Sequence, residues 1–150
     1  VLALVMAAGA LGWCLSISRV PQTLTPIIVH AIENPLVFLL ACNVVLLVVG
    51  WLMELLAAML ILIPIMVPAA ITFGIDPVHF GVMMTINLII GTIHPPIGVV
   101  LFITSRIAEI SFEKMSRAIL PWLVPLLCVL AAVTVWPPLT LWLPGLVMGK

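Results

Sequence analysis

The sequence predicts an all-α membrane protein of transmembrane helices, with one re-entrant helical hairpin and one helix that breaks inside the bilayer. Hydrophobic residues make up 65% of the chain and charged residues only 7%, against roughly 25% charged in soluble domains. The mean hydropathy is +1.47, and apolar runs long enough to cross a bilayer recur along the chain. Glycines and prolines interrupt two of these runs, and these interruptions predict the hairpin and the break.

Charge and cysteine content exclude several kinds of partner and site. Five basic and five acidic residues give a net charge of +0, so we expect no nucleic-acid surface and no polybasic lipid anchor. Cys14, Cys42 and Cys128 lie far apart in apolar stretches, match no metal spacing and are expected to face lipid or pack. The chain begins at Val1 in the middle of an apolar run, without a Met or a signal-peptide start, so we expect a fragment of a longer protein.

An apolar run and a mixed segment open the chain. Residues 1–18 carry no charge and hold about the 17 residues that a helix needs to cross the hydrocarbon core, which predicts a transmembrane helix. Arg19 and Pro21 end it. Residues 20–34 combine polar and apolar side chains at roughly helical spacing, which predicts an amphipathic helix in the membrane interface, although a connecting loop fits nearly as well.

Residues 36–73 form the predicted re-entrant hairpin, and Glu54 is the one charged residue in this range. A single straight helix would measure about 57 Å, nearly twice the hydrocarbon thickness, so the chain must fold back. The natural turn runs from Gly50 to Glu54 and leaves arms of about 15 and 19 residues. Because the first arm is short for a span, we expect a hairpin whose tip stops inside the protein.

Glu54 would cost about 2.5 kcal/mol or more if it faced lipid at a helix centre. One interpretation places it near an ion or substrate path, or has it hydrogen-bond the hairpin tip. The other places the tip at a wet interface, where Glu54 is only solvated. Asn43, seven residues before Gly50, is more typical of a hydrogen bond between helices than of a ligand.

Residues 77–108 form a predicted transmembrane helix that breaks in the middle. Asp76 can cap its first turn with Pro77 at the first helical position, and His79 is expected at the membrane interface. Eight residues then interrupt the helix, because prolines cannot donate a backbone hydrogen bond and glycines favour open backbone. Unwound backbone at membrane depth is tolerated only inside protein or along a polar cavity, so this stretch predicts a functional site. It reads Gly91, Thr92, Ile93, His94, Pro95, Pro96, Ile97 and Gly98.

Charged residues mark a return to water before the last apolar run. Ser111 begins a predicted short surface helix, and residues 119–143 form a predicted final transmembrane helix with an irregular, proline-rich end and an aromatic belt at Trp136 and Trp142. Three basic residues on one side against two on the other favour the first side as cytoplasmic. The first side holds Arg106, Lys114 and Arg117, and the other holds Arg19, Asp76 and Lys150.

The hairpin tip and the broken helix are two interruptions that can meet near the membrane midplane. Such a pair is typical of a binding site in a secondary transporter. There, the N-termini of half-helices attract anionic groups and unwound carbonyls coordinate a cation. We therefore expect residues 50–54 and 91–98 to form one site.

Several motifs, in order along the chain, closely resemble the large membrane subunit of TRAP transporters, the tripartite ATP-independent periplasmic carriers. The resemblance covers nearly the whole chain and joins these motifs at the right spacing. The motifs are VVGWLME at residues 48–54, ILIPIMVP at 61–68, GIDPVHFG at 74–81, INLIIG at 86–91 and PPIGVVLF at 95–102.

This resemblance implies a fold, a function and partners. The chain would be the C-terminal part of a longer subunit and would hold the second of two inverted repeats in an ion-transporter-type elevator fold. The subunit would take up a small organic acid, such as a C4-dicarboxylate or a sialic acid, together with Na⁺ by symport across the bacterial inner membrane. A periplasmic substrate-binding protein would deliver the substrate, and a small TRAP membrane subunit would brace the carrier.

The resemblance also assigns site residues. Gly50 and Glu54 match the hairpin tip, and four residues match the unwound loop that helps form a sodium site, namely Gly91, Pro95, Pro96 and Gly98. Backbone carbonyls near Gly50, Gly91 and His94 are the expected ligands of Na⁺, and Thr92 can supply a hydroxyl nearby.

His94 departs from the family pattern, which usually has Thr directly before the two prolines. A Thr hydroxyl suits a hard cation, whereas an imidazole offers only nitrogen, which softer transition metals prefer. The carbonyl of His94 can still coordinate sodium. Alternatively, His94 exchanges protons in place of one sodium ion, since histidine ordinarily titrates near neutral pH.

Other classes of function fit less well. An intramembrane metalloenzyme using Glu54, His79 and His94 would need a ligand spacing such as HExxH, which the sequence lacks, so we expect no enzyme and no cofactor. A channel would need a filter motif, and a purely structural subunit would not need two interruptions at membrane depth. A single-component ion-coupled dicarboxylate symporter is the alternative.

Overall fold

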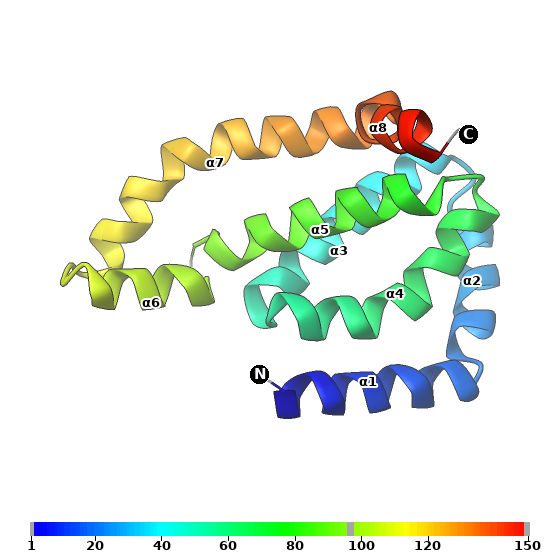
Figure 1. The fold of residues 1–150 in the computed structure, drawn as a ribbon, viewed down its shortest axis with the longest axis horizontal. Helices are drawn as coiled ribbons and strands as arrows, with labels where there is room; N and C mark the ends of the chain where they lie inside the picture. The colour runs from blue at the N-terminus through cyan, green and yellow to red at the C-terminus, as the bar shows by residue number, and fades with distance from the viewer. Residues whose placement is uncertain (1, 96–97, 149–150) are drawn as a thin grey trace.

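The computed structural model describes residues 2–95 and 98–148, and every regular element in that part of the chain is a helix (Figure 1). The expected all-α class is therefore confirmed for the described residues. The helices are α1 (Leu2–Ile17), α2 (Val20–Ala31), α3 (Pro35–Leu52), α4 (Leu55–Thr72), α5 (Pro77–Ile93), α6 (Val99–Ile107), α7 (Phe112–Val135) and α8 (Pro138–Met148).

Among the described residues, three helices are long and apolar enough to cross a membrane, namely α3, α4 and α7. The sequence predicts about 15 residues for the first hairpin arm, but α3 has 18. Asn34 caps α3 by accepting a hydrogen bond from Leu36 N at 2.9 Å, so the helix starts at Pro35, one residue earlier than expected, and at its other end it continues through the predicted turn to Leu52. The expectation that this arm is too short to span is therefore wrong, and a re-entrant path stays a prediction.

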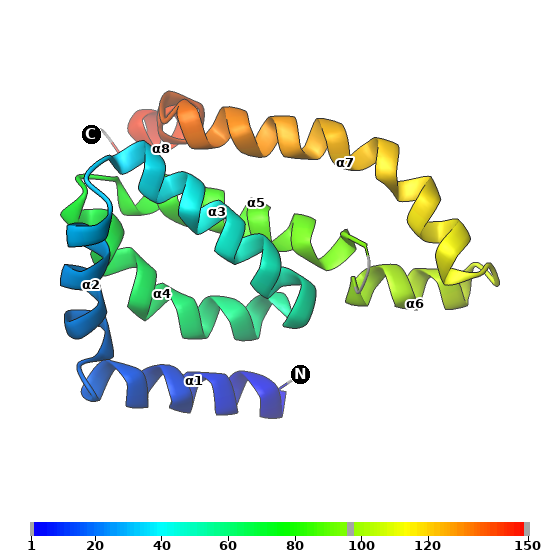
Figure 2. The same cartoon turned by 180° about the vertical axis from the view of Figure 1, so that it is seen from behind.

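The core lies where α3, α4, α5 and α7 come together. α3 packs along α5, while α1 lies against α4 and α2 covers one end of the hairpin (Figures 1 and 2). At that end, the Phe38 ring stacks on Phe73 at 4.6 Å and on Phe80 at 6.2 Å between centroids. The buried core residues are Phe38, Leu39, Cys42, Leu46, Ala58, Ala69, Ala70, Phe80, Met83, Met84, Leu88, Ile90, Leu123, Leu130 and Val133.

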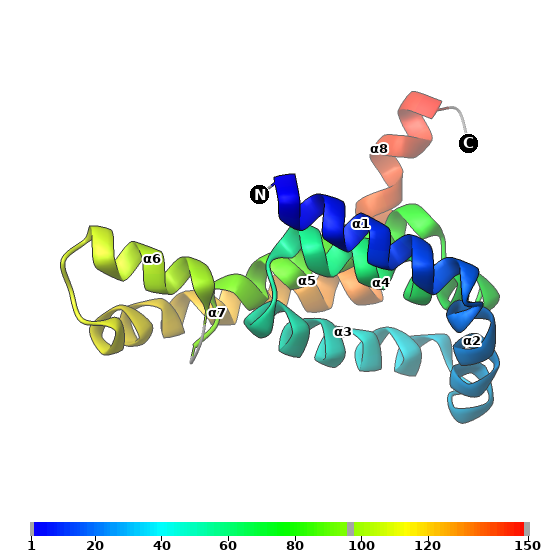
Figure 3. The ribbon, with the colours of Figure 1, turned by 90° about the horizontal axis from the view of Figure 1, so that it is seen from below.

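The C-terminal helices differ from the prediction at both ends. No separate surface helix begins at Ser111, because its side chain caps α7 itself, and α7 continues through Pro121 and Pro125. α7 then stops at Val135, and α8 begins at Pro138 and turns away from it (Figure 3). The predicted span 119–143 is thus divided between two helices.

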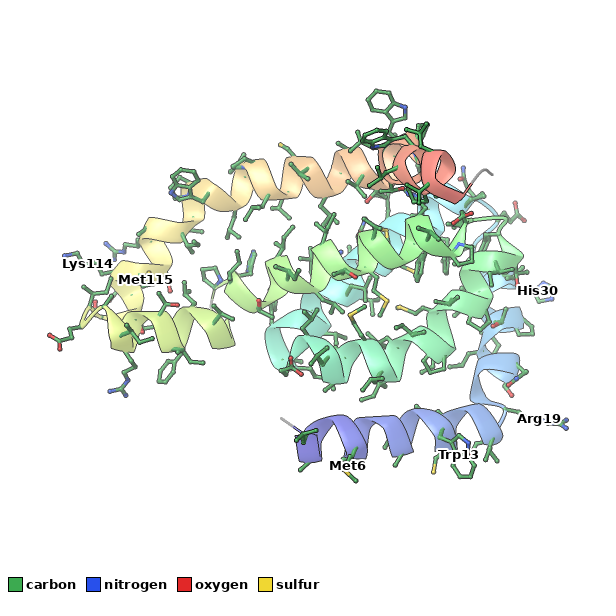
Figure 4. The ribbon with its side chains drawn as sticks, viewed as in Figure 1. Met6, Trp13, Arg19, His30, Lys114 and Met115 are labelled. Carbon is green, nitrogen blue, oxygen red and sulfur yellow. The ribbon has the colours of Figure 1, made fainter. Side chains whose placement is uncertain are left out.

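Charged side chains occupy opposite ends of the molecule. Arg19 and His30 lie at one end of the long axis and Lys114 at the other (Figure 4). The turn between α3 and α4 and the gap between α5 and α6 both lie between these ends (Figure 1). Lys150 lies outside the described residues.

Candidate binding site between the hairpin tip and the helix break

The C-terminal ends of α3 and α5 meet at two glycines. A Cβ atom added to Gly91 would lie 2.7 Å from Gly50 Cα, and one added to Gly50 would lie 3.0 Å from Gly91 Cα and 3.1 Å from Leu88 O. Because real Cβ atoms essentially never come closer than 3.0 Å to another heavy atom, the contact requires glycine at position 91, and a side chain at position 50 would be tight. The last turns of α3 and α5 therefore touch. Gly50 and Gly91 are still helical, so the hairpin tip and the break begin later than predicted, at Met53 and His94.

The break itself places two backbone carbonyls over one small residue. α5 ends at Ile93, and Gly98 precedes the first residue of α6. A Cβ atom on Gly98 would lie 3.0 Å from Thr92 O and 3.1 Å from His94 O. Carbonyl oxygens are ligands that suit a hard cation, and the missing side chain leaves room beside them.

Thr92 lies half-buried in the last turn of α5. Its Oγ1 donates a hydrogen bond to Ile89 O at 2.7 Å, so the hydroxyl hydrogen is engaged within its own helix. The lone pairs of the same oxygen stay free to accept a hydrogen bond or to contact a cation. This arrangement is compatible with the predicted supporting role of the hydroxyl.

The N-terminus of α6 has no side-chain cap, and the same is true of α2. Gly98 makes no side-chain hydrogen bond to the first turn of α6, and the first N–H groups of a helix carry a partial positive charge. The break therefore has carbonyl groups on one side and uncapped N–H groups on the other. By contrast, side chains cap α3, α4, α5 and α7 through Asn34, Glu54, Asp76 and Ser111.

Glu54 lies exposed at the hairpin tip and caps α4. Its Oε2 accepts a hydrogen bond from Ala57 N at 3.1 Å. This hydrogen bond agrees with the interpretation in which Glu54 stabilises the hairpin tip. The hydrogen bond described for this side chain stays within its own helix and does not reach the break.

His94 makes two contacts at the end of α5. Its ring stacks on the Trp51 indole at 5.0 Å between centroids, with 26° between the planes. Its Nδ1 bonds to Pro95 O, and since a carbonyl only accepts, Nδ1 is the donor of this hydrogen bond. Pro95 is half-buried, whereas Pro96 lies outside the described residues.

Sequence reasoning missed Trp51 as a neighbour of His94. The two residues lie far apart in the chain, and nothing in their spacing indicates contact. Trp51 directly follows Gly50, however, and His94 lies three residues after Gly91. Once the two glycines are known to touch, the stacking of the next bulky side chains is the expected consequence.

His79 is buried where α8 packs against the start of α5. It is only 2% exposed, and its Nδ1 bonds to Thr140 Oγ1 of α8 at 2.8 Å. The sequence pattern did not reveal this contact with α8, and the position of His79 at the membrane interface stays a prediction. Among the described residues, no three His, Cys, Asp or Glu side chains lie close enough to hold a metal ion.

The sequence of this chain matches known proteins over most of its length. Residues 1–139 match the family model of the tripartite ATP-independent periplasmic transporter, DctM component. The chain is 46% identical over 146 residues to the sialic acid TRAP transporter large permease protein SiaM of Vibrio cholerae, covering 97% of this chain and 34% of that protein.

Two further relatives carry other substrate names. The chain is 42% identical to the C4-dicarboxylate TRAP transporter large permease protein DctM of Vibrio cholerae, over 87% of this chain and 29% of that protein. It is 38% identical to the isethionate TRAP transporter permease protein DctMQ of Oleidesulfovibrio alaskensis, over 97% of this chain and 23% of that protein. The chain thus spans about a third or less of these relatives' length. It belongs to the DctM component family of tripartite ATP-independent periplasmic (TRAP) transporters, which are membrane permeases and not enzymes.

Proposed function

We propose that this chain is the C-terminal part of the large membrane subunit of a TRAP transporter that takes up a small organic anion together with sodium. The observation that carries the proposal is the contact between Gly50 and Gly91, which joins the hairpin tip to the helix break. Paired interruptions of this kind form the substrate and ion sites of secondary transporters. Here they lie side by side between the charged ends of the molecule.

Sodium is proposed to bind among backbone carbonyls at this junction. Thr92 O and His94 O converge beside Gly98, and the last turn of α3 contacts the last turn of α5 through Gly50 and Gly91. Helix C-termini carry a partial negative charge, and two of them meet here. A cation would therefore be attracted to the carbonyl side of the break.

The anion is proposed to bind on the other side of the break. The uncapped N-terminus of α6 offers N–H groups and a partial positive charge to a carboxylate. Sodium bound first would hold the tip and the break together and complete the anion site. Binding of sodium and of substrate would then be mutually cooperative.

The substrate is proposed to be a small organic acid, and the partners to be a periplasmic binding protein and a small membrane subunit. The names of the relatives support this class, since sialic acid, C4-dicarboxylates and isethionate are all organic anions. We place the carrier in the bacterial inner membrane with the hairpin re-entrant and the repeat moving as an elevator. The cluster of Arg106, Lys114 and Arg117 would face the cytoplasm.

Uptake into proteoliposomes tests the proposal. The full-length carrier and its small subunit are reconstituted, and labelled organic acids are offered with the binding protein present or absent and an inward sodium gradient on or off. We expect uptake only when both are present. Uptake that is the same with and without the binding protein would favour a single-component symporter. Uptake driven by a proton gradient alone would contradict sodium coupling.

A further inference from the structure

Three buried polar side chains connect α3, α5 and α7. On α3 and α5, they lie one to two helical turns before the glycines of the candidate site. Asn87 Nδ2 donates to Asn43 Oδ1 at 2.6 Å and to Asn43 O at 3.0 Å, and Asn43 Nδ2 donates to Thr134 Oγ1 at 2.8 Å. Asn87 is 0%, Thr134 1% and Asn43 8% exposed. The predicted role of Asn43 as a link between helices is thus confirmed, whereas sequence reasoning missed its two partners.

The hydrogen bonds of this cluster have one possible direction. The backbone carbonyl of Asn43 can only accept, so the Asn87 atom that faces it must be the amide nitrogen. The Thr134 hydroxyl donates to Leu130 O at 2.7 Å, so its oxygen accepts from Asn43. The donor and the acceptor of each hydrogen bond from Asn87 through Asn43 to Thr134 are therefore assigned. A shift of one helix along another would break these hydrogen bonds.

The cluster also shares helix faces with the two glycines of the site. Asn43 lies seven residues before Gly50, and Asn87 lies four residues before Gly91. Both spacings return to the same helix face. Sliding α3 past α5 by one turn would move Gly50 about 5.4 Å from Gly91 and bring larger side chains against it.

Stability alone does not account for amides at these positions. Asn87 Oδ1 is buried and has no hydrogen-bond partner among the described residues, which lowers stability relative to an apolar core. A buried Asn pair is known to fix the register of coiled coils while lowering their stability. We propose that Asn87 is a positioning residue that, through Asn43 and Thr134, holds the hairpin tip and the helix break in register.

Cross-linking of the full-length carrier tests the register without transport. Trp51→Cys and His94→Cys are introduced together, with the other cysteines replaced, because the two native rings lie 5.0 Å apart. With Asn87→Ala added, we expect the rate of cross-linking to fall about tenfold, since a hydrogen-bonding unit is lost. Cross-linking at the rate of the Asn87 parent would overturn the proposal.

Two further variants complete the cross-linking test. Thr85→Val is the matched control, since the hydrogen bond described for Thr85 Oγ1 goes to Gly81 O in its own helix, and the variant should cross-link like the parent. Asn43→Ala keeps the bond from Asn87 to the backbone carbonyl at position 43, so its effect should be smaller than that of Asn87→Ala. Should Asn87→Ala fail to fold, parent-like cross-linking in Asn43→Ala would overturn the proposal instead.

A transport measurement separates positioning from folding, and this arm rests on the proposed function. With Trp51 and His94 intact, Asn87→Ala should raise the sodium concentration for half-maximal uptake about tenfold, while a loss of folded carrier would lower only the maximal rate. An unchanged sodium dependence would contradict the proposal. If the parent carrier shows no sodium-driven uptake, the proposed function fails, and the cross-linking result still decides the register.

Discussion

The two ends of α5 are built in opposite ways. At its N-terminus, side chains make the contacts, since Asp76 Oδ1 accepts from Val78 N at 2.7 Å and His79 Nδ1 bonds to Thr140 Oγ1 of α8. At its C-terminus, backbone touches backbone at Gly91, and the following helix starts without a side-chain cap. An end that is capped by a side chain supports the fold, whereas an end that leaves backbone groups open can receive a ligand.

Cavity size alone would favour the other end of α5 as the candidate site. A cavity of about 520 Å³ lies beside the N-terminus of α5 and is lined by Asn34, Asp76 and His79 among others. Two of these side chains already cap α3 and α5. We therefore assign the candidate site to the junction at Gly50 and Gly91, where the carbonyl groups and the uncapped N–H groups lie.

The largest effect is expected from Gly91→Ala. The new Cβ would lie 2.7 Å from the Cα of Gly50, and backbone cannot move aside like a flexible side chain. We expect a loss of about 3 kcal/mol or more in the free energy of unfolding and loss of most uptake. Thermal unfolding of the purified carrier and proteoliposome uptake measure the two effects.

Gly81→Ala is the matched control in the same helix. No atom lies within 4 Å of a Cβ added there, so Ala should stabilise α5 by about 0.5–1 kcal/mol through its higher helix propensity. If Gly91→Ala and Gly81→Ala had the same stability and the same uptake, the contact between Gly91 and Gly50 would matter no more than the rest of α5.

Gly98→Ala should act on the ion more than on the fold. Its Cβ would meet Thr92 O at 3.0 Å and His94 O at 3.1 Å, so the carbonyls must shift by a few tenths of an ångström. We expect the sodium concentration for half-maximal uptake to rise about tenfold, which corresponds to about 1.4 kcal/mol. Gly74→Ala, at φ 74° with no atom nearby, should lower stability and leave the sodium dependence unchanged.

The sequence predicted the local breaks better than the contacts between them. Pro77 and Asp76, and the glycines and prolines of the break, act on their own backbone, so their effects could be read from the sequence. The partners of Asn43 and His79 could not, because 91 residues separate Asn43 from Thr134 and 61 separate His79 from Thr140. The C-terminal helices were divided wrongly because the charged residues 113–117 lie in the first turns of α7 and do not separate a surface helix from the apolar run that follows.

His94→Thr tests the proton hypothesis at the open end of α5. If a proton on His94 replaces one sodium ion, uptake by the parent at limiting sodium should rise as the proton concentration is raised. The variant should lose this rise and also the stack on Trp51, which contributes about 1 kcal/mol. A variant that keeps the pH profile of the parent would exclude His94 as the coupling group.

Glu54 allows the cap and the charge to be separated. Glu54→Ala removes the acceptor of the Ala57 N–H group and should lower stability by about 1 kcal/mol. Glu54→Gln keeps an acceptor oxygen and should change stability by less than about 0.5 kcal/mol, yet we expect it to lower uptake because the charge at the tip is lost. Normal uptake by Glu54→Gln would show that Glu54 acts only as a helix cap.

The smallest effect is expected far from the junction, at Glu113. Its Oε1 lies 2.7 Å from Arg117 Nη2, and both side chains are 76% exposed. Exposed pairs of this spacing contribute about 0.3–0.5 kcal/mol, so Glu113→Gln should leave thermal unfolding and uptake nearly unchanged. A fall in uptake without a fall in stability would mean that the start of α7 also shapes the ion and anion site. In that case, the C-terminal end of α5 would not be the only part of the described chain that forms the ion and anion site.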